Sequence, residues 1–185
     1  MEARVRQGTV RPSGVERTFA DDEVIVSKTD PAGRLTYVND VFCRVSAYTE
    51  EELLGKPHNV IRHPDMPRCI FKLLWDTISA GDELFAYVVN LSGDGAHYWV
   101  FAHVTPTFSA GGQIIGFHSN RRTADPAALA RITPVYQRLL AEERRHTRTP
   151  DAVAASSALL DRVVRADAGS YDEYVWSLEP EKVAR

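Results

Sequence analysis

The order of short β-rich runs along the chain constrains its fold more than any other feature. Two runs lie before a helical middle section and three lie after it, at residues 23–29, 34–38, 84–91, 98–108 and 113–122. Glycine-containing turn sequences separate neighbouring runs within each group, as in β-hairpins. Strands at both ends of a helical section favour an α+β fold, with a five-stranded antiparallel sheet and helices on one face.

Helix signals fill the section between the two groups of strands. Asn39 can cap a first short helix, and Thr49 opens a capping box for a second. From 68 to 80, apolar residues recur at steps of three and four, which lays one stripe along a longer helix. Two prolines disfavour regular helix over residues 58–66, so we expect a shaped loop there.

The chain divides into three parts by composition and pattern. Residues 1–22 are polar and form an N-terminal arm, 23–124 form the folded domain, and 125–185 form a C-terminal helical extension. Pro134 predicts a break or kink in the extension's first helix. One face of that helix carries an apolar stripe that includes Leu139, and a second copy of the chain would supply a matching surface. We therefore predict a homodimer.

Charge and motifs exclude several functional classes. The net charge is −3, so no overall basic field favours nucleic acid. No apolar run approaches the roughly 20 residues of a transmembrane helix, and no secretory signal opens the sequence, so we expect a cytoplasmic protein. Two cysteines and six histidines lack the spacing of a metal site, and no metal is expected. No catalytic motif is recognisable, and we do not expect an enzyme.

A family resemblance rests on two stretches of sequence. The stretch from Asp30 to Pro67, DPAGRLTYVNDVFCRVSAYTEEELLGKPHNVIRHPDMP, and the later GAHYWV at 95–100 resemble the PAS domain of bacterial aerotaxis receptors. The similarity covers about residues 20 to 140. It implies a PAS fold and makes 23–124 a sensory domain that binds FAD noncovalently. It also implies that the domain reports redox state to a downstream signalling protein.

The resemblance also implies which residues contact the flavin. The positions associated with the flavin in this family fall on Asn39, Arg62, His63, Asp65 and Asn90. A member of this family carries a tryptophan early in the third strand, where this chain has Leu84. The aromatic surface beside the flavin would then come from Phe85, Tyr87 or Trp75. We include Trp75 among the expected cofactor-binding residues.

The residues themselves leave other roles open. Arg62 has the planar fork of donors that suits phosphate, and it could instead pair with Asp65 to hold the loop. Asn39 is equally explained as a helix cap, and Asn90 as a turn residue. His63 could bond a flavin, sense pH or ligate haem iron.

Two alternative functions follow from these open roles. The first is a haem-binding gas sensor, with His63 or His58 as the axial ligand. The second is a cofactor-free interaction or dimerisation module whose pocket is filled by side chains.

Overall fold

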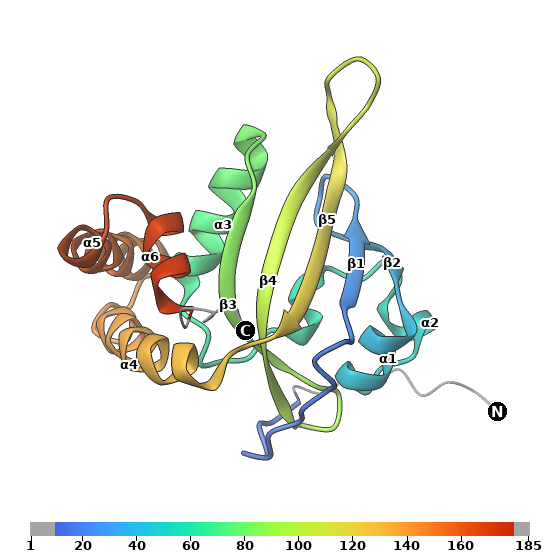
Figure 1. Cartoon of the computed structure of the whole chain (residues 1–185), viewed down its shortest axis with the longest axis horizontal. Helices are drawn as coiled ribbons and strands as arrows, with labels where there is room; N and C mark the ends of the chain where they lie inside the picture. The colour runs from blue at the N-terminus through green and yellow to red at the C-terminus, as the bar shows by residue number, and fades with distance from the viewer. Residues whose placement is uncertain (1–9, 180–185) are drawn as a thin grey trace, which may run out of the picture.

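A five-stranded antiparallel sheet with the strand order β2-β1-β5-β4-β3 forms the centre of the structure, a computed structural model that describes residues 10–179. The strands are β1 (Ile25–Thr29), β2 (Leu35–Val38), β3 (Leu84–Leu91), β4 (His97–Phe108) and β5 (Ile114–Thr123). All five predicted strands are confirmed, with bounds within two residues. Figure 1 shows that the β4–β5 hairpin reaches beyond the rest of the sheet. Residues 1–9 of the predicted arm and 180–185 of the predicted extension lie outside the described range.

The inserted helices pack on one face of this sheet. They are α1 (Asp40–Ser46), α2 (Glu50–Leu53), the 3-10 helix η1 (His58–Ile61) and α3 (Arg68–Ala80). Asn39 caps α1 through its side chain, and Thr49 and Glu52 form the predicted capping box of α2. The expected loop at 58–66 begins with the single turn of η1 and continues without regular structure.

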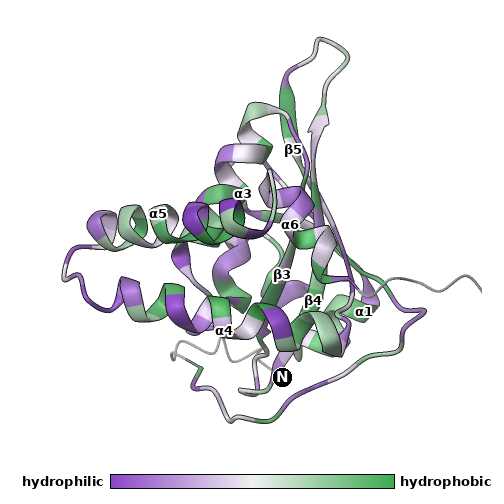
Figure 2. Cartoon of the chain, turned by 60° about the vertical axis from the view of Figure 1, so that its left-hand side comes forward, coloured by the Kyte–Doolittle hydropathy of each residue, from purple (hydrophilic) through white to green (hydrophobic). Residues whose placement is uncertain are grey.

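The C-terminal extension forms three helices beside strand β3. They are α4 (Pro126–Glu143), α5 (Thr149–Asp167) and α6 (Tyr171–Leu178), and Figures 1 and 2 show α4 and α5 lying side by side. The α6 residue Trp176 contacts the ring of Phe101 on β4, with ring centroids 5.4 Å apart. Helices therefore cover both faces of the sheet near β3, beyond the single covered face that the strand pattern predicts. Among residues 10–179, no helix has the length and apolar character needed to cross a membrane.

The apolar stripe of α4 is buried inside the chain. Ile132, Tyr136 and Leu139 are each no more than 2% exposed, and the Tyr136 hydroxyl donates to the backbone oxygen of Tyr87 on β3 at 2.6 Å. A homodimer therefore cannot use this stripe while the extension is docked, and dimerisation stays a prediction. Of the predicted break or kink at Pro134, the break does not occur, because α4 runs through this residue without interruption. Proline removes one backbone donor, and the buried residues on both sides hold the helix against the domain.

A buried carboxylate joins the extension to the domain. The N-terminus of α3 has no capping side chain of its own, and Glu143, at the end of α4, takes that place. Its Oε1 atom accepts from the backbone N–H groups of Arg68 and Cys69, at 2.7 and 3.2 Å, and from the hydroxyl of Ser156 on α5, at 3.1 Å. One side chain thus connects three helices through charge-assisted hydrogen bonds.

Candidate functional site

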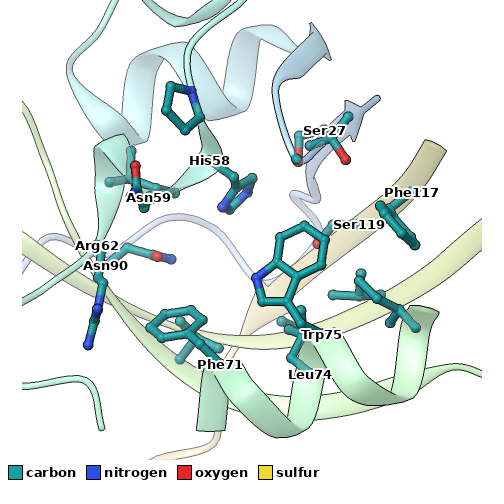
Figure 3. Close-up of a pocket in the computed structure, with 18 of the residues that line it drawn as sticks. Ser27, His58, Asn59, Arg62, Phe71, Leu74, Trp75, Asn90, Phe117 and Ser119 are labelled. Atoms are coloured by element: carbon teal, nitrogen blue, oxygen red, sulfur yellow. The ribbon is translucent and has the colours of Figure 1, made fainter. Parts of the chain in front are cut away.

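A cavity of about 450 Å³ lies between the sheet and the helices η1 and α3. Its volume falls in the range typical of small-molecule sites, about 300–1,000 Å³. Figure 3 shows side chains from η1, α3 and the sheet converging on this space. The apolar part of the wall consists of Ile61, Phe71, Leu74, Trp75, Ile78, Val88, Ala102, Val104 and Phe117. Such a wall suits a flat, largely apolar ring system.

Buried polar atoms without a hydrogen-bond partner gather in the same cavity. The described residues contain eight such side-chain atoms, and five of them belong to residues of the cavity wall. These five are Thr29 Oγ1, Arg62 Nε, Asn90 Nδ2, Ser119 Oγ and Arg121 Nη1. An unsatisfied buried polar group costs about 1–3 kcal/mol, so such groups are normally paired. Their concentration around one cavity indicates a site for a ligand with several polar atoms.

Arg121, on β5, is a buried cation at the wall of the cavity. The residue is 3% exposed. Its guanidinium donates to the Ser27 hydroxyl at 2.9 Å and contacts Nε2 of His58. No carboxylate within residues 10–179 forms an ion pair with it. Burial lowers the pKa of Arg121 to about 10, which still leaves it charged at neutral pH. The cavity therefore favours a ligand that carries negative charge.

His58 accepts a hydrogen bond from this guanidinium and is neutral. Burial, together with the positive charge of Arg121, lowers the pKa of His58 to about 3. A ring nitrogen without a proton can accept from the arginine, whereas an imidazolium beside the buried cation would repel it.

We expect acid to destabilise the fold through His58. The fold lowers the pKa of His58 from its ordinary value of 6.5 to about 3. The unfolded state therefore binds the extra proton, and stability falls as the pH drops below 6.5. Urea unfolding at pH 7.5 and pH 5 should show a loss that the variant His58→Gln reduces by about 1–2 kcal/mol. The pKa of His63 is also lowered by burial, so part of the loss remains in the variant. Equal losses in both proteins would contradict this assignment.

Three of the six expected site residues line the cavity: Arg62, Trp75 and Asn90. Arg62 and Asn90 face each other across an isolated antiparallel bridge between the loop and β3. The Arg62 guanidinium donates to the Met66 backbone oxygen at 3.1 Å and lies 5.0 Å from the centre of the Phe71 ring. The loop that carries Arg62 is therefore part of the cavity wall, as the sequence predicts.

Asn39, which is expected to contact the flavin, lies outside the cavity wall. Its side-chain oxygen accepts from the backbone N–H groups of Phe42 and Val26, and its amide donates to the oxygen of Val24. These bonds occupy both ends of the amide. Asn39 thus connects β1 to α1, which is the capping role that the sequence left open.

His63 and Asp65 also lie outside the wall. His63 is buried, and its Nδ1 atom accepts from the backbone N–H of Asp65 at 3.1 Å. The Asp65 carboxylate is 3.6 Å from Arg144 on the extension rather than paired with Arg62. Both residues shape the loop behind the cavity. In the part of the chain that the structure describes, no three His, Cys, Asp or Glu side chains are placed to hold a metal ion.

Trp75 supplies the aromatic surface at the cavity. Its ring lies edge-on to Phe117, with centroids 5.5 Å apart, and covers Gly33 in the β1–β2 turn. A Cβ atom on Gly33 would lie 2.8 Å from the Trp75 ring, so the ring approaches this closely only because residue 33 is glycine. The other two candidates, Phe85 and Tyr87, contact Phe101 instead. They lie on the opposite sheet face because side chains alternate along a strand.

Sequence reasoning missed the polar residues of β5. Phe117, Ser119 and Arg121 alternate along the strand and all line the cavity. A charged residue at the inward position of a half-buried strand is rare without a function. This alternation of inward-facing residues along β5 could have identified Arg121 as a site residue from the sequence.

Comparisons with known proteins identify the fold of the domain that holds this cavity. Residues 35–121 match the family model described as PAS fold. The chain is 41% identical to the aerotaxis receptor of Escherichia coli over 121 residues, which is 65% of this chain and 24% of that receptor. It is 29% identical to the nitrogen fixation regulatory protein of Klebsiella pneumoniae over 91 residues, 49% of this chain and 18% of that protein. The chain thus spans about a quarter or less of these relatives.

A solved structure agrees on the fold. The dark structure of the blue-light photoreceptor Aureochrome1 LOV matches with a TM-score of 0.53 and 19% identity, over 63% of this chain and 86% of that chain. At this identity the likeness concerns the fold. Together with the match to the family model, it shows that this chain contains a domain of the PAS fold, whose sequence is similar to that of the aerotaxis receptor.

Proposed function

We propose that this PAS domain is a signalling sensor that binds FAD noncovalently and reports its redox state, and that it is not an enzyme. The observation that carries the proposal is the cluster of five unpaired buried polar atoms around one apolar cavity. One of them belongs to Arg121, a buried cation without a carboxylate partner in the described residues. A flat ring system with polar edges, attached to a negatively charged chain, matches both properties. The resemblance to aerotaxis receptors supports a flavin in particular.

The wall offers each kind of contact that a flavin needs. Trp75, Phe71 and Phe117 supply flat apolar surface, while Asn90 can present a donor or an acceptor to a ring edge. A bound flavin supplies reversible electron transfer that changes its charge and hydrogen bonding. Arg121 would stabilise the more negative form because no carboxylate neutralises it. Asn90 would bond the two forms differently, which is the differential interaction that signalling requires.

The output route runs through the sheet into the extension. Asn90 lies on β3, and the backbone oxygen of Tyr87 on the same strand accepts from Tyr136 of α4. A shift of β3 would therefore change how α4 docks. A separate downstream protein would read this change, and a cytoplasmic location stays part of the proposal.

The two alternatives meet specific obstacles in the structure. Haem would need an axial ligand in the cavity, where His58 already accepts from Arg121 and His63 does not line the wall. A cofactor-free module would need a filled pocket, whereas this cavity measures about 450 Å³.

An absorption spectrum of the purified protein tests the proposal. We expect a yellow protein with flavin absorption in the blue, and release of FAD on denaturation, identified by mass. A Soret band would establish haem instead. A colourless protein that gains no flavin on reconstitution would leave the interaction module as the function.

A further inference from the structure

A second hollow adjoins the cavity on the other side of Arg62. This groove measures about 650 Å³ and shares two wall residues, Asn59 and Arg62, with the cavity. The loop of residues 59–68 forms one side, and the C-terminal end of α4 forms the other. The cavity and the groove therefore border each other at Asn59 and Arg62.

The groove is positively charged. Arg62, Arg68 and Arg144 line it, together with a single carboxylate, that of Glu143. The Glu143 Oε1 atom already accepts three hydrogen bonds from α3 and α5. Arg68 has no ion pair in the described chain, and Arg144 has only Asp65, at 3.6 Å. The three arginines therefore outnumber the carboxylates of Glu143 and Asp65, which leaves a net positive charge at the groove.

The side chain of Arg62 is itself affected by the positive charge of the groove. Burial lowers the pKa of Arg62, and the nearby charge of Arg68 lowers it further, although the charge of Glu143 acts in the opposite direction. Its Nε atom is buried without a partner. A cation held close to another cation, with a donor unused, is stabilised by an anion that reaches both.

We infer that this groove holds the phosphate chain of the flavin nucleotide, with Arg62 at the passage from the ring cavity and with Arg68 and Arg144 around the phosphates. The inference rests on the proposed function and adds a ligand-binding role for the extension. Arg144 follows the last residue of α4 and lies beyond the 35–121 range of the family match. Arginine suits this role because its planar fork can bond two phosphate oxygens at once.

Binding of three flavins to matched variants tests the inference. Riboflavin has no phosphate, FMN has one and FAD has two, so the ligands differ in the portion assigned to the groove. The test variants are Arg68→Gln, Arg144→Gln and the double variant. The control is Arg145→Gln, because Arg145 is 76% exposed, pairs with Glu142 and does not line the groove.

We expect the double variant to bind FAD at least about tenfold more weakly at low salt, from two charge-assisted contacts. Its affinity for riboflavin should stay within about twofold, with FMN between the two. The control should bind all three ligands like the original protein. Because both substituted side chains are exposed, the variants should keep the original urea midpoint.

The remaining outcomes contradict either the proposed function or the assignment of the groove to the phosphate chain. If the original protein binds none of the three flavins, the proposed function fails and this inference fails with it. If it binds flavins but the double variant loses affinity for riboflavin and FAD equally, or for neither, the inference alone is overturned. A loss in Arg145→Gln as large as in Arg144→Gln would also overturn it, since general charge would then explain the effect.

Discussion

The variant Arg121→Met is expected to make the ligand-free protein more stable while nearly abolishing flavin binding. The Arg121 guanidinium is buried without a carboxylate partner in residues 10–179, and burial lowers its pKa to about 10. An apolar side chain of similar length removes the cost of burying this charge, which should raise the free energy of unfolding by about 1–4 kcal/mol. The same change removes the cation that favours the ligand, so affinity should fall about thirtyfold or more.

The neighbouring arginine provides a matched control. Arg122 is exposed, and its guanidinium lies 5.9 Å from the Phe101 ring, on the opposite sheet face. Arg122→Met should change neither flavin affinity nor stability by much. Urea unfolding without ligand and flavin titration measure the two effects separately. A destabilised Arg121→Met protein with normal affinity would show that Arg121 serves the fold and not the ligand.

The variant Glu143→Ala is expected to cause the largest loss of stability among exchanges of polar residues. It leaves the backbone donors of Arg68 and Cys69 and the hydroxyl of Ser156 without their shared acceptor. At about 1 kcal/mol for each lost bond, the free energy of unfolding should fall by about 3 kcal/mol. Urea unfolding measures this loss directly.

The preceding residue serves as the control. Glu142 forms only surface pairs with Arg145 and His146, and such pairs contribute about 0–1 kcal/mol. Glu142→Ala should therefore be nearly neutral. Similar small losses in both variants would show that the junction between α4 and α3 contributes little to stability.

Local signals made most of the fold predictable. The capping box at Thr49, the stripe of 68–80 and the turn glycines each act within a few residues, and each element formed where its signal lay. The break predicted at Pro134 shows the limit of such signals. Burial of the flanking turns on the domain outweighed one missing backbone donor, and this packing depends on residues far away in the sequence.

The site was predictable only in part, because its polar residues come from distant segments. The motif containing Arg62 identified the loop, yet a motif cannot tell a residue facing the cavity from one behind it. His63 and Asp65 neighbour Arg62 in sequence but lie outside the wall. Conversely, Arg121 and His58 are 63 positions apart in the sequence, and only the packing of η1 against the sheet brings them together.

The C-terminal extension covers Phe101, and this contact limits where the chain can be shortened without exposing apolar side chains. Phe101 and Tyr87 are at most 4% exposed, and both lie on the sheet face that contacts α4 and α6. A shortened protein that ends at residue 124 would present these aromatic rings to water as one apolar patch, which promotes aggregation. The sheet and the extension should therefore melt together in a single cooperative transition. Recombinant expression of this sensor should retain the helices through residue 179.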